Sequence, residues 1–115
     1  MRAFFGANFI AMAALGQMPE WAGFLHGAMH VGTGVFSLYA AVAVSKGKQA
    51  KSLVIFANLF GIVDILVTAF DISFLSFEEM GVRHSINYAV FFAAPVYFWL
   101  HILSISKKLG FKLIR

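Results

Sequence analysis

Two histidines four residues apart are the side chains of this sequence whose spacing best suits chemistry. His26 and His30 lie in the stretch GFLHGAMHVGTG, residues 23–34, within a long apolar run. On a helix this spacing places both imidazoles on one face, where they can bind one ion. Asp64 could supply a carboxylate as the third ligand, so the three residues form a candidate metal site. No Glu follows His26, so the zinc-protease motif is absent.

The same histidines leave other interpretations open. The axial ligands of a b-type haem come from different helices at similar depth, and His84 would then pair with His26 or His30. A proton or ion path is another candidate, because His, Asp, Thr and Ser recur along the apolar segments. Alternatively, these polar residues only hold helices together, and Gly23 and Gly27 let the backbones approach closely.

Asp64 is the most informative single residue. An ionisable side chain within a membrane usually faces the bundle interior and has a partner there. Depth along the helices predicts His30 as that partner. The polar cluster expected in the outer half of the bundle consists of Asp64, Thr68, Asp71 and Asn87. His101 lies about 25 Å further along the last helix than His84. We therefore expect it outside this cluster, as an interface residue or part of a separate cytoplasmic-side site.

Composition indicates that lipid surrounds the elements that carry these residues. Of the 115 residues, 61% are hydrophobic and 12% charged, and the mean hydropathy is +0.84. A soluble domain has about a quarter charged residues and about half apolar ones. A chain this short cannot bury so much apolar surface within itself. Cysteine is absent, which excludes disulfides, thiolate catalysis and Cys-based zinc or iron–sulfur sites.

Apolar segments bounded by charges or breaks predict an all-α fold. A spanning helix needs about 20 mostly apolar residues. The expected helices cover about 3–18, 21–45, 52–74 and 84–106. The segment 3–18 is short, at about 24 Å, but we expect it to cross because the charge pattern is then consistent. Short loops indicate antiparallel neighbours. The prediction is a single transmembrane domain, residues 1–115, folded as an integral membrane four-helix bundle.

The charges predict the orientation of this bundle. The lysines of KGKQAK, residues 46–51, and the basic residues of KKLGFKLIR, residues 107–115, fall on one side, and Arg2 joins them if the first segment crosses. By the positive-inside rule, both termini are then cytoplasmic in a cell inner membrane. The net charge of +4 does not indicate nucleic-acid binding, because the basic residues lie in short runs beside apolar segments.

Several short motifs resemble those of a group of small, uncharacterised bacterial multi-pass membrane proteins. They are Arg2, GQMP (16–19), HGAMHVGTG (26–34), NLFGIVD (58–64) and PVYFWLHILS (95–104), and together they cover most of the chain. The resemblance implies a membrane bundle and no particular activity, and it raises Asp64 and His101 as candidates. In that group the Gly-rich helix tends to carry an Asp where His30 stands here. A histidine facing Asp64 suggests a neutralised pair rather than a shared proton or a cation.

These observations predict a small polytopic membrane protein with a binding or structural role, in contact with lipid. We expect it to assemble with itself or with a larger membrane complex. The alternative is a cofactor-binding subunit, with haem b or a divalent metal ion held by the histidines, and the third possibility is proton- or ion-coupled transport. Catalysis is not expected, because no nucleophile elbow such as G-x-S-x-G is present.

Overall fold

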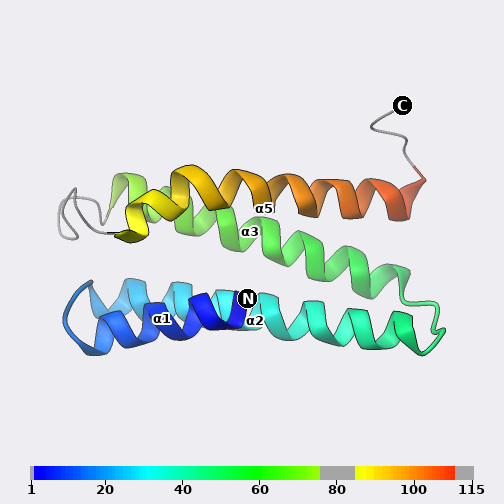
Figure 1. The fold of residues 1–115 in the computed structure, drawn as a ribbon, viewed down its shortest axis with the longest axis horizontal. Coiled ribbons are helices and arrows are strands. Elements are labelled where there is room, and N and C mark those ends of the chain that lie inside the picture. Colours follow the sequence, from blue (N-terminus) through cyan, green and yellow to red (C-terminus); the bar gives the residue numbers. More distant parts are fainter. Residues whose placement is uncertain (1, 76–84, 111–115) are drawn as a thin grey trace.

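The computed structural model describes residues 2–75 and 85–110, with side chains described at 2–75 and 92–110. Within these residues every regular element is a helix. The helices are α1 (Arg2–Ala14), α2 (Glu20–Ser45), α3 (Lys51–Phe74) and α5 (Ser85–Leu109). The all-α expectation with four helices is therefore confirmed for the described residues. Figure 1 shows two pairs of helices, α1 beside α2 and α5 beside α3, and the pairs meet where α3 contacts α2.

Glycines in the left-handed conformation end the first two helices. After α1, Gly16 has φ +67°, and the N–H groups of Gly16 and Gln17 donate to the carbonyls of Ala13 and Met12. This is the Schellman pattern, which satisfies the last carbonyls of a helix. Gly47, with φ +70°, ends α2 in the same way. The predicted end of the first helix at residue 18 is therefore wrong, because Gly16 stops the helix at Ala14.

Small residues bring α1 and α2 into close contact. A Cβ atom added to Gly6 would lie 2.6 Å from the carbonyl oxygen of Gly27, and one added to Gly34 would lie 3.1 Å from the backbone nitrogen of Ala3. A side chain at Gly23 would overlap Ala13. The glycines of the stretch 23–34 thus form the surface of α2 against which α1 packs. The packing interpretation predicts this close approach for Gly23 and Gly27.

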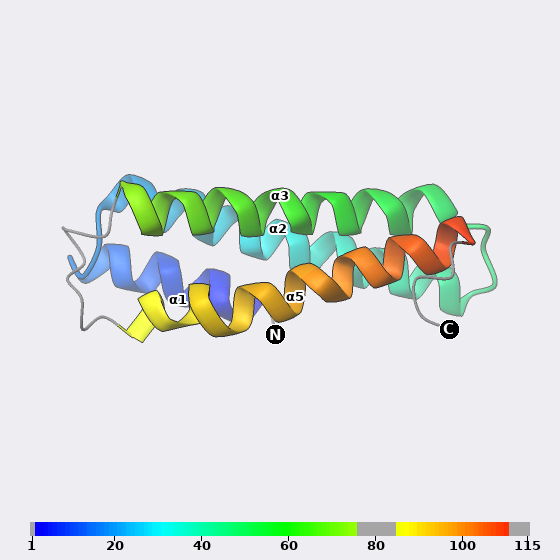
Figure 2. The same ribbon diagram turned by 90° about the horizontal axis from the view of Figure 1, so that it is seen from above.

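The first helix runs along only half of the second. α1 has 13 residues against 26 in α2, or about 20 Å against about 39 Å. Figures 1 and 2 both place its start near the middle of the long axis. Arg2 lies there and contacts Asp64 of α3, whereas the lysines flank the α2–α3 turn at one end. The expectation that Arg2 joins the lysines is wrong, because α1 is too short to reach them.

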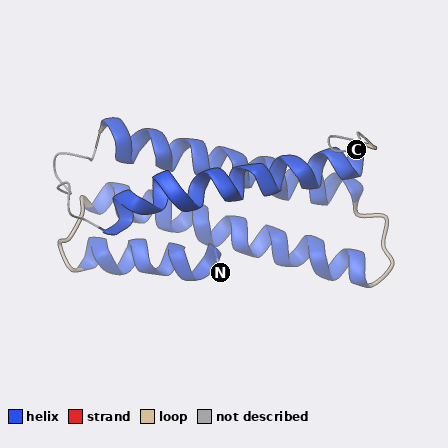
Figure 3. Cartoon of the chain, turned by 45° about the horizontal axis from the view of Figure 1, so that its top comes forward, coloured by secondary structure: helices blue, strands red, loops and turns tan. Residues whose placement is uncertain are grey.

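The outer surface of the helices is apolar and the buried interior is partly polar. Exposed large apolar residues occur on every described helix, among them Phe4, Leu38, Leu66 and Trp99. The buried side chains include His26, Thr33 and Asp64, which are fully enclosed. Among the described helices, α2 and α3 are long and apolar enough to cross a membrane. Figure 3 shows the helices running nearly parallel to one long axis, so α2 and α3 lie along the same direction.

Candidate functional site

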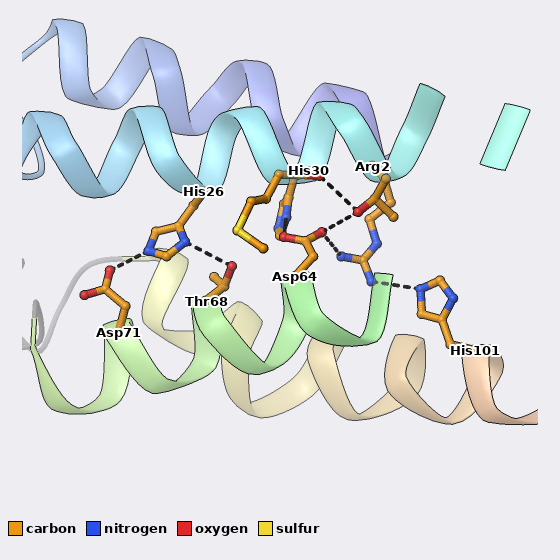
Figure 4. Close-up of polar contacts among 9 residues, drawn as sticks. Arg2, His26, His30, Asp64, Thr68, Asp71 and His101 are labelled. Carbon is orange, nitrogen blue, oxygen red and sulfur yellow. Dashed lines mark hydrogen bonds and ion pairs between the residues drawn. The ribbon is translucent and has the colours of Figure 1, made fainter. Parts of the chain in front are cut away.

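The carboxylate of Asp64 is the centre of a buried polar network (Figure 4). Asp64 is 0% exposed and lies near the middle of α3. It accepts hydrogen bonds from Arg2 Nη1 at 3.0 Å, from Thr33 Oγ1 at 2.9 Å and from His30 Nδ1 at 2.5 Å. The predicted pair of His30 and Asp64 is thus confirmed. One carboxylate connects α1, α2 and α3, and the donors compensate the cost of burying its charge.

Arg2 extends this network to α5. Its Nη2 donates to Nε2 of His101 at 3.3 Å, and its guanidinium lies 4.9 Å from the centre of the Tyr97 ring. A cation over an aromatic face is attracted by the ring electrons. Among the described side chains, Arg2 Nε is the buried polar atom that lacks a hydrogen-bond partner. The other described partners of the guanidinium, namely Asp64, His101 and Tyr97, come from two helices, α3 and α5.

Hydrogen bonding determines which nitrogen of His101 carries the proton. The Asn58 amide donates to the Val54 carbonyl at 2.7 Å, so its Oδ1 is turned towards His101 Nδ1, at 2.9 Å. An amide oxygen only accepts, so Nδ1 of His101 is the protonated nitrogen. Nε2 then has a lone pair for the Arg2 donor. His101 is therefore a neutral bridge between Asn58 and Arg2.

The position of His101 departs from the sequence-based expectation. We expected it near one end of the bundle, apart from the cluster around Asp64. Instead it lies over Gly61 of α3, where an added Cβ would come within 2.5 Å of its ring. The glycine leaves room for the imidazole, and the long Arg2 side chain spans the remaining distance to Asp64. His101 thus belongs to the Asp64 network.

His30 and Asp64 form one histidine–aspartate couple, and His26 and Asp71 form a second. The second couple lies further along the helices, towards the α1–α2 turn. His26 is 0% exposed, with its Nε2 at 2.5 Å from Asp71 Oδ2 and its Nδ1 at 3.2 Å from Thr68 Oγ1. With the proton on Nε2, the imidazole donates to the carboxylate and accepts from the hydroxyl. The three side chains join α2 to α3 about one turn to two turns from Asp64.

Phe9 of α1 closes the space between the two couples. Its ring centre lies 5.8 Å from that of His26 and 5.2 Å from that of His30, edge-on to the latter. Phe9 is itself 3% exposed. The aromatic ring therefore packs against both imidazoles. The arrangement has the Asp–His–hydroxyl order of a catalytic triad, with His26 fully buried and Thr68 6% exposed.

The structure divides the residues of the predicted metal site. His30 is paired with Asp64, whereas His26 is paired with Asp71. In the part of the chain that the structure describes, no group of three or more His, Cys, Asp or Glu side chains is placed to hold a metal ion. The haem alternative requires His84, which lies outside the described residues. Asn87, expected in the polar cluster, belongs to α5, but its side chain is outside the described part.

Sequence reasoning missed Arg2 and Tyr97 as members of the site. Arg2 was interpreted as a topology-determining residue at the membrane surface. The signal that places Arg2 inside the bundle is Gly16, because this glycine ends α1. A helix of 13 residues leaves its first residue far short of the opposite end of the bundle. The role of Tyr97 depends on the crossing of α5 over α3, for which the sequence carries no local signal.

Comparison with known protein families places this architecture in one of them. A family model described as a domain of unknown function, DUF8737, matches residues 1–107. The chain belongs to this family. Neither the comparison with curated proteins nor the comparison with solved structures found a match. The match includes all of the network described above, so the site lies within the family's domain.

Proposed function

We propose that the chain is an integral membrane protein in which α2, α3 and α5 cross the bilayer and α1 reaches its middle. The distribution of polarity supports this placement. Large apolar side chains are exposed on the outside of the helices, whereas His26, Asp64 and Asp71 are buried and paired inside. In lipid, this pattern costs little, because ionisable groups face the bundle interior. In water, the exposed apolar surface would lead to association.

The lysines support a cytoplasmic position for the α2–α3 turn. Lys46 and Lys48 flank this turn, Lys51 opens α3, and Lys107 and Lys108 lie in the last turn of α5. These residues gather at one end of the bundle, as the positive-inside rule requires for the cytoplasmic side. The resemblance to small bacterial multi-pass proteins supports the inner membrane of a bacterium as the location.

Within that membrane, we assign the protein a structural or binding role rather than a catalytic one. The observation that carries this proposal is the use of Asp64 as a common partner of Arg2, His30 and Thr33. Through Arg2 the carboxylate is linked to His101, so every described helix contributes to one network. Such a network fixes the register and orientation of the helices. The fixed bundle then presents constant apolar faces to lipid or to a partner.

The test compares Asp64→Asn with Asp64→Leu in bacterial membranes and in mild detergent. We expect both proteins to remain in the membrane fraction after alkaline carbonate extraction. We also expect Asp64→Leu to lose the native oligomer, as measured by gel filtration with light scattering. Asp64→Asn keeps a hydrogen-bonding group and should retain part of the oligomer. Release of the wild type by carbonate would contradict the membrane placement. An unchanged oligomer in Asp64→Leu would contradict the structural role of the network.

An apolar stripe on α3 favours assembly with a second copy. Five large residues recur at alternating steps of three and four, and each is at least half exposed: Phe56, Leu59, Val63, Leu66 and Phe70. A seven-residue repeat of this kind is the seam that two helices share in knobs-into-holes packing. In a membrane, such packing and its van der Waals contacts drive helix association. We propose this stripe as the contact between copies.

Proton transfer is the second candidate function. Two imidazoles are each hydrogen-bonded to a carboxylate at 2.5 Å, which is how proton-handling residues are arranged. Arg2, however, places a permanent positive charge next to Asp64, and such a charge opposes the passage of protons and cations. A flux assay in proteoliposomes with a pH-sensitive dye tests this function. Proton flux lost in His26→Ala and in His30→Ala would favour transport over the structural role.

A further inference from the structure

A groove lies at the lysine end of the bundle, on the far side of Arg2 from Phe9. It has a volume of about 460 Å³ and is lined by residues of α2, α3 and α5. Most of these residues are small, such as Ala41 and Ala57, or carry a hydroxyl, such as Ser37 and Ser104. The volume falls within the range of small-molecule sites, about 300–1,000 Å³.

The groove lies along α2 on the continuation of the face against which α1 packs. Gly34 contacts the first residues of α1, and Ala41 lies seven residues further, on the same face of the helix. The other small residues that line the groove on this stretch of α2 are Ser37, Ala40 and Ser45. Gly34 contacts Ala3 near the start of α1 (Arg2–Ala14), and the described residues of α1 do not extend over the face of α2 beyond it. The groove is thus lined by α2, α3 and α5, and α1 does not cover it.

The length and lining of the groove suit an extended hydrocarbon chain. The lining of α2 extends from Ser37 to Ser45, or about 12 Å. Its lining includes apolar side chains such as Val54 along this length, and a single extended hydrocarbon chain can pack against them. The inner end suits such a chain, because Asn58 is already bonded to Val54 and His101 and needs no further partner.

The charges at the open end indicate an anion. Lys108 lines the groove, and Lys46, Lys48, Lys51 and Lys107 belong to the same end of the bundle. The described acidic residues all lie elsewhere: Glu20 begins α2 at the opposite end, and Asp64 and Asp71 are buried in the network. Basic pockets between helices on the cytoplasmic side of a membrane attract anionic lipid head groups.

We propose that the groove binds an anionic phospholipid, with one acyl chain between α2, α3 and α5 and the phosphate at Lys108. The proposal rests on the membrane placement given above. A two-chain lipid then has its second chain in the surrounding bilayer, because the groove is open along one side. The short first helix, on this proposal, creates a lipid site in the half of the bundle that it does not cover.

Native mass spectrometry of the full chain from mild detergent tests the proposal. The protein is mixed with equimolar phosphatidylglycerol and phosphatidylcholine, and the retained lipid is counted. We expect phosphatidylglycerol to be preferred. Lys108→Gln should lower its retention about fivefold, because one basic residue near an anionic head group contributes about 1 kcal/mol. Ala41→Leu, which fills the groove at an exposed position of α2, should remove the preference altogether.

Two matched variants separate the groove from general surface effects. Lys48→Gln removes a lysine of the same end that does not line the groove, and Val35→Leu enlarges an exposed apolar residue of α2 outside it. Val35→Leu should bind phosphatidylglycerol as the wild type does, and Lys48→Gln should lose clearly less of it than Lys108→Gln, because Lys48 does not line the groove. Equal losses in Lys48→Gln and Lys108→Gln, or equal retention of the two lipids by the wild type, would overturn the proposal.

Free oleate provides the remaining arm of the test. If oleate binds in a Lys108-dependent way and phosphatidylglycerol does not, the occupant is a fatty acid and the phospholipid proposal is wrong. Failure of the lipid preference in a protein that resists carbonate extraction overturns this inference alone. Release by carbonate overturns the membrane placement itself, so the two failures are distinguishable.

Discussion

Arg2, the first residue of α1, donates a hydrogen bond at 3.0 Å to the fully buried carboxylate of Asp64 in the middle of α3. The two residues are 62 positions apart in the chain. This ion pair holds the start of a half-length helix inside the bundle rather than at its end. It also explains how His101, on the last helix, comes into contact with the same network.

Breaking this pair from one side should be more damaging than removing it from both. Asp64→Leu leaves Arg2 buried without its carboxylate, and loss of one partner of a buried pair costs about 3–5 kcal/mol. Arg2→Leu combined with Asp64→Leu removes both charges and should recover part of that loss. Thermal unfolding in detergent, followed by circular dichroism, measures the double-mutant cycle. Additive losses would show that the two side chains do not interact.

The couple of His26 and Asp71 should behave as an independent unit. Asp71→Asn weakens the hydrogen bond to His26 Nε2 and should destabilise the protein by about 1.5–3 kcal/mol, as for hydrogen bonds to charged groups. Its effect should add to that of Asp64→Asn, because the hydrogen bonds described above for the two couples have no side chain in common. The same unfolding assay measures both variants and the combination. Strong non-additivity would indicate one coupled network.

Gly61 should be intolerant of a side chain. A Cβ there would lie 2.5 Å from the His101 ring, so Gly61→Ala must displace the imidazole from Asn58 and Arg2. We expect a loss of about 1–3 kcal/mol, typical of overpacking. Gly32→Ala is the control, because its added Cβ meets only the edge of the Phe60 ring, at 3.3 Å. If the two variants unfold at the same temperature, His101 is not held against Gly61.

Single cysteines can locate the contact between copies, because the natural chain has none. Val63→Cys places a thiol in the centre of the α3 stripe, and Val35→Cys places one at a slightly more exposed position on α2. We expect mild oxidation in membranes to give at least tenfold more disulfide-linked dimer with Val63→Cys than with Val35→Cys. A tenfold preference corresponds to a contact free energy of about 1.4 kcal/mol. Equal cross-linking of both would contradict the proposed stripe.

The absorption spectrum and metal content test the cofactor alternative. Each histidine of the opening motif is engaged by its own carboxylate, and a metal ion needs ligands that converge. We therefore expect purified protein without a Soret band and without stoichiometric metal at His26 and His30. A Soret band or a bound metal that disappears in His30→Ala would make the protein a cofactor-binding subunit instead.

The sequence by itself determined the helical class, the approximate segments and the pairing of His30 with Asp64. These features depend on local properties: apolar segment length, glycine and charge positions, and depth along a helix of known rise. The tertiary structure alone decided that Arg2 is buried, that His101 shares its network, and that His26 pairs with Asp71. Those outcomes depend on the crossing of helices and on the reach of long side chains, which are properties of packing between distant segments. The same packing, with α1 covering half of α2, created the groove that no local pattern predicts.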